Sequence, residues 1–126
     1  MRKTIKRTIK QVWTNEDFGL TFTDNFLQNP DNNISWCELW CETGSKHIFI
    51  GQDLSPKKIE KAIKKFMLNQ IKLKIKNRAR DFDLKLKIRT LKNGLKINAE
   101  TFDLTKYNND YAWLLTMIVD NFFHKH

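Results

Sequence analysis

Alternation of apolar and charged residues is most regular between residues 81 and 102. Up to Ile88 every second residue is apolar, and the residues between them are mostly lysine or arginine. Asn93-Gly94 is a favoured two-residue turn, because a type I′ turn needs positive φ at both central positions. The pattern therefore predicts a β-hairpin closed by Asn93-Gly94, in which Ile88 lies opposite Ala99.

The two faces of this hairpin differ in chemistry, because successive side chains of a strand point to opposite sides of the sheet. One face is expected to carry the apolar residues Phe82, Leu84, Leu86, Ile88, Ile97 and Ala99. The other face is expected to carry the mostly polar residues Asp83, Lys85, Lys87, Arg89, Leu91, Lys96, Asn98 and Glu100. The hairpin is thus predicted to have one apolar face and one basic face.

Residues 71–76, with the sequence IKLKIK, continue the period of two. We interpret them as a further strand beside the hairpin, and a continuation of the preceding helix is the competing interpretation. That helix is predicted to begin at Ser55-Pro56, since serine is a good N-cap and proline suits the first helical position. Its apolar stripe ends near Leu68, where the period changes.

Helical spacing appears in two other stretches. Residues 3–13 place apolar side chains at i, i+4, i+7 and i+8, which favours an amphipathic helix over the alternative, a strand. Residues 109–124 are apolar almost all round, which is typical of a helix buried in the core or in a subunit interface. A homo-oligomer of this protein would use residues 109–124 as its interface.

Strands are predicted over residues 18–22, 34–42 and 47–51, with a loop at residues 28–33. The order that these elements suggest is α-βββα-βββα. We therefore predict an α+β fold, with a mostly antiparallel sheet and helices packed on one face. At 126 residues the chain is expected to form a single domain, 1–126.

The formal charge of +9 is concentrated in one part of the chain. Residues 56–96 contain fifteen Lys/Arg and three acids, whereas residues 11–55 contain one lysine and seven acids. A block of positive charge can hold a polyanion through its local field and the release of counterions. The alternative is a lysine-rich composition that places lysine wherever an element meets water.

A basic binding surface follows if residues 71–76 pair beside the hairpin. Its cations are Lys72, Lys74, Lys76, Lys85, Lys87, Arg89 and Lys96. The surface contains no aromatic residue, and modules that read single strands stack bases on aromatic rings. Lysine also outnumbers arginine, which disfavours readout of base edges. The predicted partner is a duplex or structured nucleic acid, bound with low sequence specificity, or an acidic protein surface.

Other chemistries find little support in the sequence. The soft metal ligands are Cys37, Cys41, His47, His124 and His126, and their spacing matches no metal motif. Asp81, Asp83 and Lys85 resemble part of a nuclease site but lack the further acid that such sites need. We expect no metal, no cofactor and no enzymatic activity.

The absence of a secretion signal, of a membrane-length apolar run and of a disulfide pattern indicates a cytoplasmic protein. The predicted function is non-enzymatic binding of the nucleic-acid backbone through the lysine-rich face. The alternative is a protein–protein inhibitor or immunity-type protein, of mobile-element or phage-like character, that binds and neutralises a partner enzyme.

Overall fold

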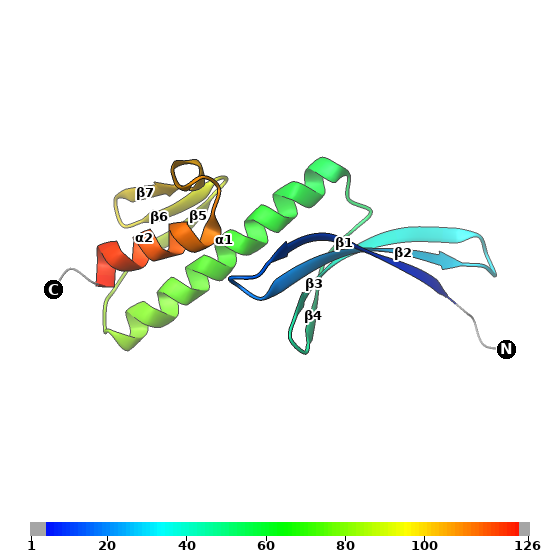
Figure 1. The fold of residues 1–126 in the computed structure, drawn as a ribbon, viewed down its shortest axis with the longest axis horizontal. Coiled ribbons are helices and arrows are strands. Elements are labelled where there is room, and N and C mark those ends of the chain that lie inside the picture. The colour runs from blue at the N-terminus through cyan, green and yellow to red at the C-terminus, as the bar shows by residue number, and fades with distance from the viewer. Residues whose placement is uncertain (1–4, 124–126) are drawn as a thin grey trace. The chain divides into compact units, whose positions relative to one another are not determined.

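The computed structural model describes residues 5–123 and shows an α+β fold with two antiparallel sheets and two α-helices (Figure 1). Its elements, in chain order, are β1 (Lys6–Asn15), β2 (Leu20–Asn29), β3 (Ile34–Thr43), β4 (Lys46–Gln52), α1 (Pro56–Asp81), β5 (Ile88–Leu91), β6 (Gly94–Ile97), β7 (Glu100–Asp103), the 3-10 helix η1 (Leu104–Tyr107) and α2 (Tyr111–Phe123). The α+β class is confirmed. The predicted order α-βββα-βββα is wrong, because four strands precede α1 and three follow it.

The chain divides into two compact units, and the boundary falls between Ala62 and Ile63, within α1. Each unit has a sheet of its own, with strand order β1-β2-β3-β4 in the first and β5-β6-β7 in the second. Neither α1 nor α2 combines the length and the apolar character that a membrane-crossing helix needs.

Strand β1 corrects the helix predicted for residues 3–13, of which residues 3 and 4 lie outside the described range. The strand pairs with β2 along its whole length, and a β-bulge between Gln11 and Trp13 interrupts the register. A bulge adds one residue and so shifts the alternation of faces. The extra residue, Val12, therefore gave the apolar positions a helix-like spacing, although β-branched residues such as Ile9 and Thr8 favour a strand.

The remaining strands of the first unit follow the sequence pattern. Strands β3 and β4 agree with the strands predicted for residues 34–42 and 47–51. Strand β2 begins two residues later than the strand predicted for residues 18–22 and continues to Asn29, so it takes in the first two residues of the predicted loop 28–33. Gly19 and Gly44 have positive φ in the turns before β2 and β4. One face of the sheet carries the buried side chains of Phe22, Leu39 and Cys41.

Helix α1 begins as predicted but continues far beyond Leu68. The Lys58 backbone N–H donates to Ser55 Oγ at 3.4 Å, which caps the first turn. Residues 71–76 are part of this helix, so their assignment as a strand is wrong. The buried residues of this part of α1 recur at helical spacing; they are Ile63, Met67, Leu68, Ile71, Ile75 and Ala79.

Helix α1 ends at a left-handed residue, a position that glycine usually occupies and that Asp83 occupies here. Asp83 adopts a left-handed conformation, with φ of 55°. The Leu84 backbone N–H then donates to the Ala79 carbonyl oxygen at 2.8 Å, which satisfies a carbonyl group of the last helical turn. Beyond this cap the chain reverses and runs as an extended segment, residues 84–87, into β5.

The hairpin of residues 81–102 is shorter than predicted and has a different register. The paired strands are β5 and β6, in which Ile88 lies opposite Ile97 and Arg89 lies opposite Lys96. The predicted partner of Ile88, Ala99, is displaced by two positions. Because the period of a strand is two, this displacement leaves the side chains of β5 and β6 on their predicted faces. Glu100, predicted on the basic face, instead lies opposite Ile97 and shares the apolar face.

Gly94 explains the displaced register. It lies in β6 opposite Asp103, where a Cβ atom would come within 2.0 Å of the Phe102 carbonyl oxygen. The Asn93 side chain is also committed, because its Oδ1 accepts from Lys64 Nζ at 2.7 Å and its Nδ2 donates to Asp103 Oδ1 at 2.9 Å. Neither residue has positive φ. Gly94 therefore belongs to β6, where it allows β7 to approach, and Lys92-Asn93 forms the turn.

Strand β7 was not predicted, because the turn before it contains no glycine or proline. Asn98 takes the left-handed conformation in this turn, with φ of 55°, and Ile97 pairs with Glu100 across it. Asparagine tolerates this region better than other non-glycine residues. The resulting strand places Phe102 in the core of the second unit.

Helix α2 confirms the helix predicted for residues 109–124, as far as the described residues extend. Asp110 caps it, since the Trp113 backbone N–H donates to Asp110 Oδ1 at 3.1 Å. Four of its residues are buried, namely Tyr111, Leu114, Ile118 and Phe123, whereas Trp113 and Met117 are exposed. Phe123 packs edge-on against Phe82, with ring centroids 5.4 Å apart, so α2 lies beside the end of α1 (Figure 1).

Candidate functional site

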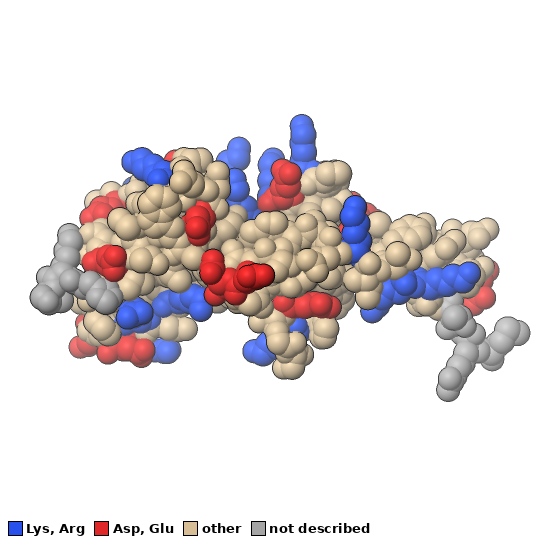
Figure 2. Space-filling view, in the orientation of Figure 1, with Lys and Arg blue, Asp and Glu red and all other residues tan. Residues whose placement is uncertain are grey.

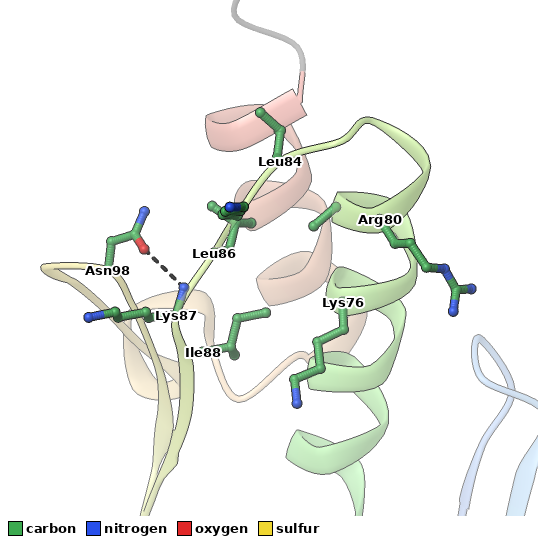
Figure 3. A pocket seen from close by; sticks show the side chains of 9 residues that line it. Lys76, Arg80, Leu84, Leu86, Lys87, Ile88 and Asn98 are labelled. Atoms are coloured by element: carbon green, nitrogen blue, oxygen red, sulfur yellow. Dashed lines mark hydrogen bonds between the residues drawn. The ribbon is translucent and has the colours of Figure 1, made fainter.

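A groove lies between the last turns of α1 and the extended segment that follows the helix. Its volume is about 420 Å³. The residues that line it are Lys76, Ala79, Arg80, Leu84, Lys85, Leu86, Lys87, Ile88 and Asn98. Figure 3 shows the segment running beside α1, with Lys76 and Ile88 directed into the space between them. The guanidinium of Arg80 extends away from the segment, so Arg80 borders the groove without closing it.

Asn98 holds the open side of this groove in place. Its Oδ1 accepts the Lys87 backbone N–H at 3.0 Å, and the Lys87 carbonyl oxygen accepts the Asn98 backbone N–H at 2.8 Å (Figure 3). At its other end the segment is held by the helix cap at Ala79. The lysines of residues 84–87 are therefore carried by a backbone that is fixed at both ends.

A second, smaller groove continues the first. It has a volume of about 230 Å³ and is lined by Lys87, Ile88, Arg89, Lys96 and Asn98, three of which also line the larger groove. The cations of the two grooves together are Lys76, Arg80, Lys85, Lys87, Arg89 and Lys96. We call these six residues and the space that they border the basic groove.

The basic groove contains no compensating acid. No Asp or Glu lines either cavity, and none of the six cations forms an ion pair with any residue in the described range 5–123. Arg89 and Lys96 lie directly opposite each other in the β5–β6 ladder, an arrangement that destabilises a sheet. The local field is therefore positive, at a cost in stability that an anionic ligand would offset.

The positive charge of the protein is distributed unevenly between its two units. On the face drawn in Figure 2, acidic and basic side chains are interspersed, and much of the surface is uncharged. By sequence, residues 63–126 contain fourteen Lys/Arg and six acids, whereas residues 1–62 contain nine and eight. The excess thus belongs to the second unit, which carries the basic groove.

Five of the seven cations predicted to share a surface lie around this groove, namely Lys76, Lys85, Lys87, Arg89 and Lys96. Lys72 lines neither cavity and lies one helical turn before Lys76. Lys74 lines a different groove, between the end of α1 and α2, together with Arg78 and Asp81. The surface is a border between a helix and a strand, and the sheet face predicted from strand pairing of residues 71–76 does not exist.

Arg80 is the member of the basic groove that the sequence interpretation missed. It lies four residues after Lys76, so the two share one side of a helix. This signal was visible only if residues 71–81 were taken as helical. Because residues 71–76 were assigned to a strand, the helical spacing between Lys76 and Arg80 was not recognised.

The two cysteines are free, and among residues 5–123 no three His, Cys, Asp or Glu side chains come together as a metal site. His124 and His126, two of the candidate ligands, lie outside the described residues.

Burial raises the pKa of the Cys41 thiol to about 11, with a smaller contribution from the Glu42 carboxylate. Burial also raises the pKa of Cys37, followed by the negative charges of Asp24 and Asp53.

We expect Cys41 to react slowly with thiol reagents in the folded protein. At pH 8 a thiol with a pKa of about 11 is roughly 0.1% thiolate, and the thiolate is the nucleophile. In a Cys37→Ser variant, Ellman's reagent at pH 8 should therefore modify Cys41 about 100-fold more slowly than in urea. Equal rates in the folded and unfolded protein would contradict the burial of Cys41.

A search of protein-family models, curated proteins and solved structures finds no match for this chain. The chemistry of the basic groove is thus the basis for a functional proposal. Its lining residues include no Phe, Tyr or Trp.

Proposed function

We propose that the protein is a cytoplasmic, non-enzymatic binding protein that holds the phosphate backbone of a nucleic acid in the basic groove. The observation that carries this proposal is the gathering of six cations, without an acid among them, around one continuous groove. Each cation that contacts a phosphate releases condensed counterions, and this release favours binding. Free Cys37 and Cys41 fit the reducing compartment in which such a partner is found.

The chemistry of the groove favours a duplex or structured nucleic acid over a single strand. Its lining residues offer no aromatic ring on which an unpaired base could stack. Four of the six cations are lysines, which bind phosphate as point charges and lack the planar fork that reads guanine. The proposal therefore includes low sequence specificity.

Binding should depend steeply on salt. If all six cations contact phosphates, the slope of log K against log salt concentration on duplex DNA is about −5. Fluorescence anisotropy with a labelled duplex of mixed sequence, and in parallel with an RNA hairpin, measures this slope. The triple variant Lys85→Gln/Lys87→Gln/Arg89→Gln should make the slope shallower by about 3 and weaken binding by about two orders of magnitude near 0.1 M salt.

A matched control removes the same charge from another part of the chain. The triple variant Lys57→Gln/Lys58→Gln/Lys61→Gln alters three exposed lysines at the beginning of α1 that line neither cavity of the basic groove. It should keep the slope of the unmodified protein. Equal losses in both variants, or no binding to DNA and RNA at low salt, would rule out the basic groove as a nucleic-acid site.

A second candidate function rests on the floor of the groove. Leu84, Leu86 and Ile88 make this floor apolar, and within the described residues no hydrogen bond occupies the backbone of Lys85 or Leu86. An extended acidic peptide could add to such a segment as a strand. The protein would then act as an inhibitor or immunity-type protein that binds and neutralises an enzyme.

Pull-downs run in parallel with and without nuclease separate the two functions. Recovery of one stoichiometric protein after nuclease treatment would favour the inhibitor. Loss of all bound material on nuclease treatment would favour the nucleic-acid partner. The Lys85→Gln/Lys87→Gln/Arg89→Gln variant should lose either partner, which ties the result to the basic groove.

A further inference from the structure

The face of the β1–β4 sheet opposite Phe22 and Cys41 carries a cluster of two indoles and one carboxylate. Trp36, Glu38 and Trp40 alternate along β3 and therefore share this face. Trp36 Nε1 donates to Glu38 Oε2 at 2.8 Å, and Trp40 Nε1 donates to Glu38 Oε1 at 3.0 Å. Each oxygen of the carboxylate thus accepts one indole N–H, which fixes the side chain between the two rings.

The neighbouring strands hold this cluster rigidly. On β2, the residues opposite Trp36, Glu38 and Trp40 are all buried; they are Leu27, Asn25 and Thr23. Asn25 Nδ2 donates to Thr23 Oγ1 at 3.0 Å, so these two buried polar side chains beside the cluster are hydrogen-bonded to each other. On β4, Phe49 packs edge-on against Trp40, with ring centroids 5.4 Å apart. The cluster is preorganised before any ligand binds.

The same face exposes apolar side chains. Ile9 is 59% exposed, Ile34 is 55% exposed and Phe49 is 49% exposed, and the strand registers place all three on the face of Trp36 and Trp40. Exposed apolar surface that surrounds a fixed polar group is characteristic of an interaction site. The first unit therefore has a face suited to a partner with apolar side chains.

The carboxylate at the centre of this face retains capacity for a cation. Glu38 forms no ion pair with any residue in the described part of the chain, and each of its oxygens has a further acceptor site. The indole N–H groups of Trp36 and Trp40 lower the pKa of Glu38, with a further contribution from the charge of Arg7. The group is thus an anion at neutral pH, bordered by two aromatic rings.

We propose that the face formed by Trp36, Glu38, Trp40 and Phe49 binds an arginine side chain that projects from an apolar segment of a partner protein. A planar guanidinium can bond both oxygens of one carboxylate and stack on an indole, whereas an ammonium group cannot do both. Charge complementarity supports this partner, because the charged residues that the strand registers place on this face are Glu38, Glu42 and Arg7, so acids outnumber cations there. The same charges disfavour a phosphate backbone, and the site does not rest on the function of the basic groove.

Titration with a short peptide tests this site. The probe is acetyl-Val-Thr-Arg-Thr-Val-amide, followed by ¹H–¹⁵N NMR into the millimolar range. The indole N–H resonances of Trp36 and Trp40 should shift and saturate, while those of Trp13 and Trp113 stay in place. A peptide with Gln in place of Arg should produce no saturable shift. Shifts that are equal for both peptides, or absent for both, would overturn the proposal.

Two variants locate the binding energy. Glu38→Gln should weaken the Arg peptide about tenfold or more, because a hydrogen bond to a charged group is lost. Glu42→Gln removes the same charge from the same strand and face, where Glu42 contacts His47 at 3.3 Å, and should leave the affinity within about twofold. Equal weakening by both variants would reduce the effect to net charge and contradict the site.

A third variant keeps the charge and alters one ring. Trp40→Phe retains Glu38 but removes an indole that faces the ligand, so it should also weaken the Arg peptide. Preserved dispersion of the NMR spectrum shows that each variant is folded. If a DNA duplex shifts the indoles of Trp36 and Trp40 as the Arg peptide does, the face binds nucleic acid and the proposal of a protein partner fails.

Discussion

Ile75→Ala is expected to lower the free energy of unfolding by about 2–5 kcal/mol, whereas Leu73→Ala should change it by less than about 0.5 kcal/mol. Ile75 is 0% exposed and Leu73 is 53% exposed, although the two residues are only two positions apart. In a helix they lie about 200° apart around the axis, so one faces the core and the other faces water. Urea unfolding followed by far-UV circular dichroism measures both changes.

The pair of variants tests the helix directly, because a strand makes the opposite prediction. In a strand, residues 73 and 75 would share one face and lose similar burial on truncation to alanine. Similar destabilisation by Ile75→Ala and Leu73→Ala would therefore contradict the helical assignment of residues 71–76. It would also separate Lys76 from Arg80, which share one side of α1.

Gly94→Ala is expected to destabilise the protein by about 3 kcal/mol. A Cβ atom at this position would lie 2.0 Å from the Phe102 carbonyl oxygen and 3.1 Å from Asp103 Cα. Both obstacles are backbone atoms of the paired strand β7, so β6 and β7 must move apart to admit the methyl group. The cost should appear as a lower urea midpoint with an unchanged slope.

Gly44→Ala is the matched control for this variant. Gly44 has φ of +56° in a turn with nothing within 4 Å of an added Cβ, so only backbone strain opposes alanine. That strain amounts to about 1 kcal/mol. If Asn93-Gly94 formed the type I′ turn expected from the sequence, Gly94→Ala would cost about as much as Gly44→Ala. Equal costs would thus favour the predicted turn over the observed one.

The local sequence predicted several elements correctly because their signals are short-range. Ser55-Pro56 is sufficient to begin α1, since the serine hydroxyl and the fixed φ of proline act within one turn. The faces of the β5–β6 hairpin were also predicted, although its register was wrong. A shift of two residues preserves a period of two, so alternation determines the face without determining the partner.

The basic groove could be predicted from the sequence only in part. Its lysines were visible in the sequence, and Lys85 and Lys87 alternate with leucines as predicted. Their setting depends on a helix cap at Asp83 and on Asn98, two residues in left-handed conformations that any glycine-based turn search overlooks. The Trp36–Glu38–Trp40 cluster likewise lies on a predicted strand, residues 34–42, but its hydrogen bonds depend on side-chain geometry.

By itself, the sequence determined the α+β class, the beginning of α1, the strands β3 and β4, the helix α2 and the concentration of positive charge after residue 55. Each of these depends on neighbours in the chain. Only the tertiary structure decided that residues 71–76 are helical, that Gly94 allows β6 and β7 to pair closely and that Arg80 joins the basic groove. These outcomes depend on packing between elements: the burial of Ile71 and Ile75 favours a helix over a strand at residues 71–76, and the Phe102 carbonyl oxygen of the paired strand determines the role of Gly94. The pattern of residue types does not reveal which atoms of different elements come into contact, because that depends on how the whole chain folds.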